Sequence, residues 1–430
     1  MMKNSLFNCV IKSGNKHILT VLGMKIEFYT SAKSSKWFYK RARLLLKILD
    51  KLLPKDKYKV IFDSYPDFAD SAYLFYEFLK EKKQDKFKKI IWLKEEIESS
   101  HSKINDKIYP LYSIKGIWNL ITAKYIIHDH CNEFLDFITS DRHVLFNLWH
   151  GSPIKAIGMM DDDVLPKTRR RYNYMAKHSY WFVSSDIYKV IISSMLQIDP
   201  KKIYVTGIVR TDVIFKEGKE EHIKNVFGLN GFDSIVLYAP TYKTRGAKKI
   251  DVKVNADTLF CFDKYNDDDF IKYLKGNNIC LIIKPHPFEE AGFIKFLNDN
   301  NYTNLENVKI ITTNDLTEKA INLNELFRVT DLIISDFSSI TIDYAISKKP
   351  ILYLTHYLQN YRDGRGFILP DNLKILMPGE TVNNYEELIN KMAICLKTKE
   401  QNYTDEELKF IYKYLDGKSC ERIFEVMKEL

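Results

Sequence analysis

From residue 58 onward, short apolar runs alternate with stretches of helical periodicity. Runs such as Ile235–Ala239 and Cys280–Lys284 do not alternate between apolar and polar positions. This pattern is typical of strands that are buried on both faces, as in a parallel sheet covered by helices. Because such strands alternate with helical stretches along the chain, the sequence predicts an α/β fold.

The expected strands form two groups, separated by the polar, glycine-containing stretch Lys216–Asp233. We therefore expect two Rossmann-like domains, residues 58–215 and 230–430, after an N-terminal region of residues 1–57. The second domain is expected to end in a helical segment, Thr404–Leu430. The expected strands are Tyr58–Asp63, Lys89–Leu93, Lys124–His128, Val144–Trp149, Tyr180–Ser184, Ile203–Thr206, Ser234–Ala239, Ile279–Lys284, Val308–Ile311, Asp331–Ser335 and Pro350–Leu354.

The stretch Lys33–Lys59 holds ten Lys or Arg residues and two Asp residues, so it carries nearly all of the net charge of +9. It also predicts an amphipathic helix that ends at Pro54. A basic amphipathic helix suits an anionic membrane surface, but it can equally pack on a neighbouring domain with its cations in solvent. The apolar positions at helical spacing are Phe38, Leu45, Ile48, Leu49 and Leu52.

The composition excludes a chain that is disordered, collagen-like or coiled-coil over its whole length. With 45% hydrophobic and 28% charged residues, the chain has an ordinary globular composition. None of its six Cys residues forms a CxxC pair, so we expect no zinc site or disulfide framework and a reducing, cytoplasmic compartment. We find no apolar run near the ~20 residues that span a bilayer and no signal-peptide core. Motifs for nucleic-acid binding are also missing, so no nucleic-acid partner is expected.

Polar residues follow five of the expected strands. In open α/β sheets, ligands bind beyond the carboxyl ends of the strands, so these residues are the candidates for a site. The segments are His150-Gly151-Ser152-Pro153, Gly207 to Asp212, Pro240-Thr241, Pro285-His286-Pro287 and Asp336-Phe337-Ser338-Ser339, the last followed by a helix with Asp343.

These residues suit transfer from a phosphate-bearing donor to a hydroxyl group. Cations, hydroxyls and backbone amides can hold a diphosphate, and a His can act as a general base near neutral pH. No P-loop sequence is present. Each residue also has a structural explanation: Ser338 can cap a helix, His286 can be a hydrogen-bonded core residue, and Arg210 can form an ion pair. His128-Asp129-His130 lacks an evident third ligand, so we expect no metal site there.

In their order and spacing, these segments resemble the CDP-glycerol glycerophosphotransferase family of teichoic acid primases and polymerases. The resemblance extends over about residues 58–400. It includes Phe62-Asp63-Ser64 near the start and Arg365-Gly366-Phe367 with Pro378-Gly379 near the end.

The resemblance implies the GT-B fold, in which two Rossmann-like domains face a cleft that holds the donor. It implies transfer of a polyol phosphate, above all glycerol phosphate, from a CDP-polyol to a hydroxyl of a lipid-linked or growing surface polymer, with release of CMP. The expected place is the cytoplasmic face of the membrane, with peripheral attachment, in teichoic acid or capsule-type polymer synthesis. The partners would be donor, acceptor and an anionic membrane surface, and no cofactor or metal is expected.

The resemblance also assigns roles to residues. His150 would be the base on the acceptor hydroxyl, and His286 would act with Lys284 and Arg210 on the diphosphate and the leaving CMP. The other substrate-binding residues would be Gly151, Ser152, Pro153, Ile154, Pro240, Thr241, Pro285, Ser338, Ser339 and Asp343.

The chain departs from the family pattern at a few positions. Tyr242-Lys243 stands where Trp-Arg is usual, Ser152 replaces Thr, and Val209 replaces Pro. These changes leave the identity of the polyol open. Two alternatives remain: a nucleotide-sugar glycosyltransferase of the same fold, which would release UDP or GDP, and a peripheral membrane protein with a decayed site. Intact His150 and His286 argue against decay.

Overall fold

The computed structural model divides the chain into two compact units. The first comprises Met1–Asn147 and His178–Tyr180, and the second comprises Leu148–Lys177 and Trp181–Leu430. The domain boundaries expected from the sequence rest on the stretch Lys216–Asp233 and stay a prediction. The structure describes residues 7–12, 16–21, 24–29, 32–65, 67–82, 87–94, 107–138, 141–161, 164–241, 244–245, 248–249, 258–264, 266–287, 289–364 and 366–430.

A parallel sheet forms the centre of the first unit. Its central strand, β4 (Asp56–Asp63), pairs on one side with β5 (Lys89–Lys94), which pairs with β6 (Lys107–Pro110). On its other side β4 pairs with β7 (Ala123–His128), which pairs with β8 (Val144–Asn147). The inner residues of β4 are fully buried, which explains why this strand lacks polar alternation. Helices α2 (Asp70–Lys82) and α3 (Ile114–Thr122) belong to the same unit.

The N-terminal region contains a small antiparallel sheet and a long helix. Strands β1 (Phe7–Lys12), β2 (Lys16–Val21) and β3 (Met24–Tyr29) pair in sequence order and precede α1 (Ala32–Leu52). Helix α1 ends before Pro54, as expected. Its side chains are described only from Tyr39 onward, so those of Lys33, Lys36, Trp37 and Phe38 lie outside the described part.

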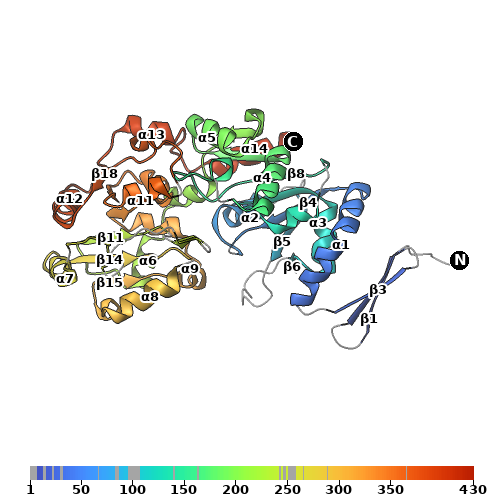
Figure 1. Cartoon of the computed structure of the whole chain (residues 1–430), viewed down its shortest axis with the longest axis horizontal. Helices are drawn as coiled ribbons and strands as arrows, with labels where there is room; N and C mark the ends of the chain where they lie inside the picture. Colours follow the sequence, from blue (N-terminus) through green and yellow to red (C-terminus); the bar gives the residue numbers. More distant parts are fainter. Residues whose placement is uncertain are drawn as a thin grey trace. The chain divides into compact units, whose positions relative to one another are not determined.

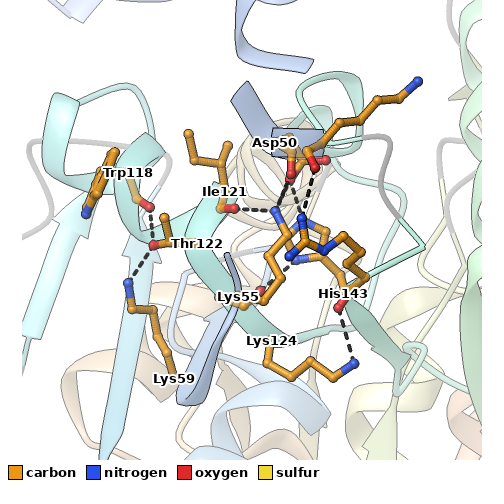
Figure 2. A network of polar contacts seen from close by, with 11 residues as sticks. Asp50, Lys55, Lys59, Trp118, Ile121, Thr122, Lys124 and His143 are labelled. Carbon is orange, nitrogen blue, oxygen red and sulfur yellow. Dashed lines mark hydrogen bonds and ion pairs between the residues drawn. The ribbon is translucent and has the colours of Figure 1, made fainter. Parts of the chain in front are cut away.

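Buried polar contacts fix the end of α1 to the rest of the first unit (Figure 2). The fully buried Asp50 accepts hydrogen bonds from Lys55 Nζ at 2.7 Å and from His143 Nε2 at 2.6 Å. Lys55 also donates to the carbonyl of Ile121 at 2.5 Å, and His143 Nδ1 lies 2.7 Å from the carbonyl of Ala123. One carboxylate on α1 thereby joins the ends of α3, β7 and β8.

A six-stranded parallel sheet forms the core of the second unit, in the order β15-β14-β11-β16-β17-β18. Its neighbouring strands β11, β14 and β15 are labelled in Figure 1. Four of these strands are buried along their whole length, and helices α7 (Asp267–Gly276) and α12 (Tyr385–Thr398) pack against the sheet. The strands are β11 (Ser234–Tyr238), β14 (Ile279–Ile283), β15 (Val308–Ile310), β16 (Leu332–Ser335), β17 (Ile351–Leu354) and β18 (Glu380–Val382).

The second unit also contains β10 (Ile203–Val205), which pairs in parallel with β9 (Ser179–Val183). Residue 180 is the last of the first unit, so β9 continues from one unit into the other. The remaining helices are α4 (Pro166–His178), α5 (Asp186–Leu196), α6 (Glu220–Phe227), α7 (Asp267–Gly276), α8 (Glu290–Asp299), α9 (Thr313–Glu318), α10 (Ile340–Ala345), α11 (Leu358–Asp363), α12 (Tyr385–Thr398), α13 (Asp405–Ile411) and α14 (Ser419–Glu429).

The structure confirms the α/β class with two parallel sheets. All eleven expected strands are present within two residues of their expected bounds. The arrangement of two domains facing a cleft stays a prediction. The C-terminal segment forms α13 and α14, and the backbone amides of Ser419 and Cys420 donate to Asp212 at 3.1 and 2.9 Å. The end of the chain is therefore fixed within the second unit.

Candidate functional site

His150 stands on a constrained piece of backbone just after β8. The preceding residue, Trp149, has φ +50°, a conformation that is strained for a bulky residue and is often found at functional sites. The Trp149 ring is buried, stacks on His150 with a centroid distance of 4.2 Å, and contacts Trp181 at 5.1 Å. His150 itself is exposed. The imidazole is thus oriented by a fixed aromatic ring while it remains accessible to a substrate.

Arg210, in the short helical segment η4 (Val209–Phe215), holds the backbone of His150. Its Nη1 donates to the His150 carbonyl at 2.6 Å, and its Nε forms an ion pair with Asp343 Oδ2 at 2.5 Å. Asp343 is fully buried and also accepts from Asn324 Nδ2 at 3.3 Å and from Tyr412 OH at 3.3 Å. Asp343 therefore orients Arg210, and Arg210 fixes the carbonyl of the candidate base.

Gly151 allows three segments to approach one another. Its φ is +129°, and a Cβ at this position would lie 2.4 Å from Arg210 Nη2 and 3.1 Å from Ser339 Oγ. A side chain here would displace both groups, so the position requires glycine. The residues after β8, η4 and the residues after β16 thus meet at the backbone of Gly151.

The ends of β11 and β16 are joined by hydrogen bonds around a buried carboxylate. The amide and hydroxyl of Thr241 donate to Asp336 at 2.9 and 2.6 Å, and Tyr357 OH donates to the same carboxylate at 2.7 Å. The hydroxyl of Tyr361 lies 2.8 Å from Thr241 Oγ1. Asp336 is therefore an organising residue that sets the positions of Thr241 and two tyrosines.

His286 and Lys284 follow β14 in different environments. Lys284 is buried, and its Nζ donates to Glu290 Oε1 at 2.7 Å and to Thr313 Oγ1 at 3.2 Å. Burial lowers the pKa of Lys284, against the opposite effect of Glu290. His286 is half-buried, and burial, followed by the charges of Lys155 and Lys284, lowers its pKa to about 4. His286 is consequently neutral at pH 7.

The residues predicted to form the site differ in accessibility. His150, His286, Ser338 and Ser339 are exposed or half-buried, and Arg210 is largely covered. Ser339 is the N-cap of α10 but makes no side-chain cap hydrogen bond, so its hydroxyl does not serve the helix. The buried residues shape the loops: Gly151, Ser152, Pro153, Ile154, Pro240, Thr241, Lys284, Pro285 and Asp343. The roles that the sequence assigned to all of these residues stay predictions.

The sequence analysis did not single out Lys155, which lies near the candidate residues. This residue lies five positions after His150, and its Nζ is 4.8 Å from the centroid of the Tyr361 ring. A signal was available, because Lys155 belongs to the same loop as the His150-Gly151 motif. Tyr242, Lys243 and Arg365 lie outside the described residues.

No group of three or more His, Cys, Asp or Glu side chains is placed to hold a metal ion within the described ranges. His128 is fully buried, and its Nδ1 lies 2.8 Å from the carbonyl of His130. Burial lowers the pKa of His128 to about 3. The geometry therefore gives His128 and His130 a structural place at the end of β7, and metal independence stays a prediction.

Comparison with known proteins identifies the family. The model of the CDP-Glycerol:Poly(glycerophosphate) glycerophosphotransferase family matches residues 45–429. The chain belongs to this family. It is therefore a transferase that moves glycerol phosphate from CDP-glycerol in teichoic acid synthesis, which confirms the resemblance seen in the sequence. The nucleotide-sugar alternative is correspondingly disfavoured.

Individual relatives support this assignment. The chain is 27% identical over 375 residues to a teichoic acid poly(glycerol phosphate) polymerase of Bacillus spizizenii, covering 83% of this chain and 87% of the relative. It is 27% identical over 251 residues to the teichoic acid ribitol-phosphate polymerase TarL of Staphylococcus aureus, covering 56% of this chain and 40% of TarL. A solved structure of the wall teichoic acid polymerase TagF matches with a TM-score of 0.70 at 18% identity, over 93% of this chain and 97% of that one. The last match shows a shared fold.

Proposed function

We propose that the protein transfers glycerol phosphate from CDP-glycerol to a hydroxyl group at the end of a lipid-linked glycan or a growing polyol-phosphate chain. Glycerol is favoured over ribitol because the family model that matches residues 45–429 is that of a glycerophosphotransferase, and because a glycerol-phosphate polymerase is 27% identical over 83% of this chain. The observation that carries the proposal is the exposed His150, oriented by Trp149 and held through its carbonyl by Arg210.

In this proposal His150 accepts the proton of the acceptor hydroxyl. The hydroxyl oxygen then bonds to the phosphorus that carries glycerol, and the bond from that phosphorus to the oxygen of CMP breaks with its electron pair. General-base catalysis by a positioned His typically raises the rate roughly 10²–10⁴-fold. Neutral His286 donates an N–H hydrogen bond to the donor, and the hydroxyls of Ser338 and Ser339 bind its phosphates. Arg210 serves this site by holding His150.

Peripheral attachment to the membrane is part of the proposal. Helix α1 exposes Leu44, Leu45, Ile48 and Leu52, while Tyr39, Leu46 and Asp50 are buried. The same helix also exposes four cationic residues: Lys40, Arg41, Arg43 and Lys51. A helix with both features suits the interface of an anionic bilayer, where an acceptor with a lipid anchor would be held. None of the helices in the described part of the chain is long and apolar enough to cross a membrane.

The proposed donor is tested by nucleotide release. The purified protein is incubated with CDP-glycerol, CDP-ribitol and UDP-sugars, with and without a lipid-linked glycan acceptor, and the released nucleotide is quantified. Release of CMP from CDP-glycerol that depends on the acceptor is the expected result. Faster release from CDP-ribitol would replace glycerol by ribitol, and turnover of UDP-sugars alone would refute the proposed donor.

A further inference from the structure

The ammonium group of Lys284 is used completely by hydrogen bonds within the second unit. A lysine side chain has three N–H donors and no acceptor. Lys284 Nζ donates to the carbonyl of Pro285 at 2.8 Å. It also donates to Glu290 Oε1 at 2.7 Å and to Thr313 Oγ1 at 3.2 Å, and the side chain is only 5% exposed. A diphosphate could therefore contact this ammonium group only if one of the three bonds broke.

Glu290 connects the loop after β14 with the loop after β15. Its Oε1 accepts from the amide of Thr313 at 2.8 Å and from the hydroxyl of Thr313 at 2.7 Å, besides the ammonium group of Lys284. Lys284 follows β14, Glu290 begins α8, and Thr313 begins α9. Because β14 and β15 are parallel neighbours, their carboxyl ends lie at the same edge of the sheet. Lys284, Glu290 and Thr313 thus form a triad that joins the two loops at this edge.

The backbone is held by hydrogen bonds on both sides of His286. Before it, the carbonyl of Pro285 accepts from Lys284 Nζ. After it, the carbonyl of His286 itself accepts from the amide of Glu289 at 2.9 Å. The rings of Pro285 and Pro287 also restrict the φ angles of this loop. The half-buried imidazole of His286 therefore stands on a backbone whose position depends on Lys284.

We propose that Lys284, Glu290 and Thr313 are positioning residues for His286, and that Lys284 does not contact the donor. This proposal rests on the proposed function, in which His286 donates a hydrogen bond to CDP-glycerol. Such a bond accelerates transfer only when its donor is placed accurately, and a misplacement of about 1 Å can cost roughly 100-fold in rate. Loss of a triad member should therefore lower kcat, with little change in the binding of the diphosphate.

The opposite charges in the triad distinguish positioning from direct binding. If Lys284 bound the diphosphate, Lys284→Met would weaken donor binding, whereas Glu290→Gln would keep or strengthen it by removing an anion. If the triad positions His286, each variant should lower kcat roughly 10- to 100-fold. The double variant should then lose little more than either single variant, because residues that act as one unit give non-additive effects. Steady-state kinetics of the full chain, with CDP-glycerol and a lipid-linked glycan acceptor, measure these losses.

Two further sets of variants control for lost charge and for lost volume. Lys272 forms an exposed ion pair with Asp269 at 3.4 Å on α7 of the same unit, so Lys272→Met should behave as the wild type. Thr313→Val keeps the shape of the side chain but removes its hydroxyl, so it should also lower kcat. Thr313→Ser should recover most of that loss, because it restores the hydroxyl that bonds to Glu290.

Two measurements judge the triad without turnover. The imidazole resonances of His286, followed by NMR, should shift in Lys284→Met and in Glu290→Gln but not in Lys272→Met. Calorimetry should show that CDP binds to Lys284→Met nearly as well as to the wild type. Both measurements remain decisive if the wild type proves inactive with CDP-glycerol, so a failure of the proposed function can be told from a failure of this inference.

Weaker binding of CDP to Lys284→Met, with unchanged or tighter binding to Glu290→Gln, would overturn the proposal, because it would show that Lys284 acts on the diphosphate. Unchanged kcat and unchanged His286 resonances in both variants would also overturn it. Circular dichroism and urea unfolding establish which variants are folded under the assay conditions. If Lys284→Met does not fold, Glu290→Gln and Thr313→Val carry the same test.

Discussion

Asp343 and Arg210 form a unit that acts on the candidate base. Because Asp343 is buried and forms an ion pair with Arg210, we expect Asp343→Asn to lower kcat about 10- to 100-fold, since the charge that orients Arg210 is lost. The KM for CDP-glycerol should change little, since His150 and not the donor is displaced. Steady-state kinetics check this, with the exposed Asp405→Asn as the control.

A double-mutant cycle with Arg210→Lys distinguishes this explanation from direct donor binding by Asp343. Residues that act through one another give strongly non-additive effects. The Asp343→Asn and Arg210→Lys variants combined should therefore lose little more activity than either alone. Additive losses, together with a raised KM for the donor in Asp343→Asn, would show that Asp343 binds the donor itself.

The sequence could propose candidate residues for the chemistry, but not how each side chain is placed, and the roles of these candidates stay predictions. His150 and His286 are candidates because polar residues at the carboxyl ends of parallel strands gather at one edge of a sheet. Lys284 and Lys155 both accompany a His, and only the structure shows that Lys284 is bonded to Glu290 while Lys155 lies on Tyr361. Such pairings join residues distant in the sequence, so no local pattern reveals them.

Helix α1 depends on Asp50 for its attachment. Asp50→Ala would leave the buried Lys55 and His143 without their carboxylate, and breaking a buried ion pair costs about 3–5 kcal/mol. We expect a loss of this size in the free energy of unfolding in urea, and faster hydrogen exchange in residues 39–52. In the control Asp56→Ala, the pair with the more exposed Lys89 is lost, which should cost below about 1 kcal/mol. Equal losses in both variants would contradict this account.

The end of β7 predicts a specific dependence of stability on pH. Burial lowers the pKa of His128 to about 3, so its stabilising contribution is present above pH ~6.5 and is lost as pH falls toward 3. Burial raises the pKa of Asp129 to about 6, against the effect of His130. The stabilising contribution of Asp129 is therefore present below pH ~3.8 and is lost as pH rises through 6. The contributions of Asp129 and His128 to stability thus change with pH in opposite directions.

Two variants separate these contributions. Between pH ~7 and ~4, His128→Gln should lose stability less steeply than the wild type, and Asp129→Asn should lose it more steeply. Urea unfolding across this range measures both slopes. Slopes that match the wild type in both variants would show that neither group changes its protonation on unfolding.

The buried strands and the edge strands β10 and β15 were predictable, whereas the edge strands β6 and β18 were not. β11, β14 and the segment Val60–Phe62 of β4 are buried and mostly apolar because both faces of the sheet are covered, and this pattern can be read from the sequence alone. β6 and β18 are only three or four residues long and partly exposed, so their sequences resemble loops. The antiparallel strands β1 to β3 were also missed, although Ser13-Gly14-Asn15 is a turn signal.

At the scale of the whole molecule, α1 is expected to bind the protein to anionic membranes. Each cation near such a surface contributes about 1 kcal/mol, and the exposed leucines add shallow burial. Co-sedimentation with anionic vesicles should therefore fall when Lys40, Arg41 and Arg43 are changed to Gln, and also when salt is raised. A matched control changes Lys272, Lys275 and Lys397 to Gln. Equal binding of both triple variants would place the membrane contact elsewhere.

The most direct measurement of the central claim is the mass of the acceptor after reaction with CDP-glycerol. The wild type should add whole glycerol phosphate residues to the acceptor and release one CMP for each residue added. His150→Ala, with the candidate base removed and the fold retained, should transfer about 10²–10⁴-fold more slowly. An acceptor that gains sugar or nothing, or a His150→Ala variant as fast as the wild type, would contradict the account.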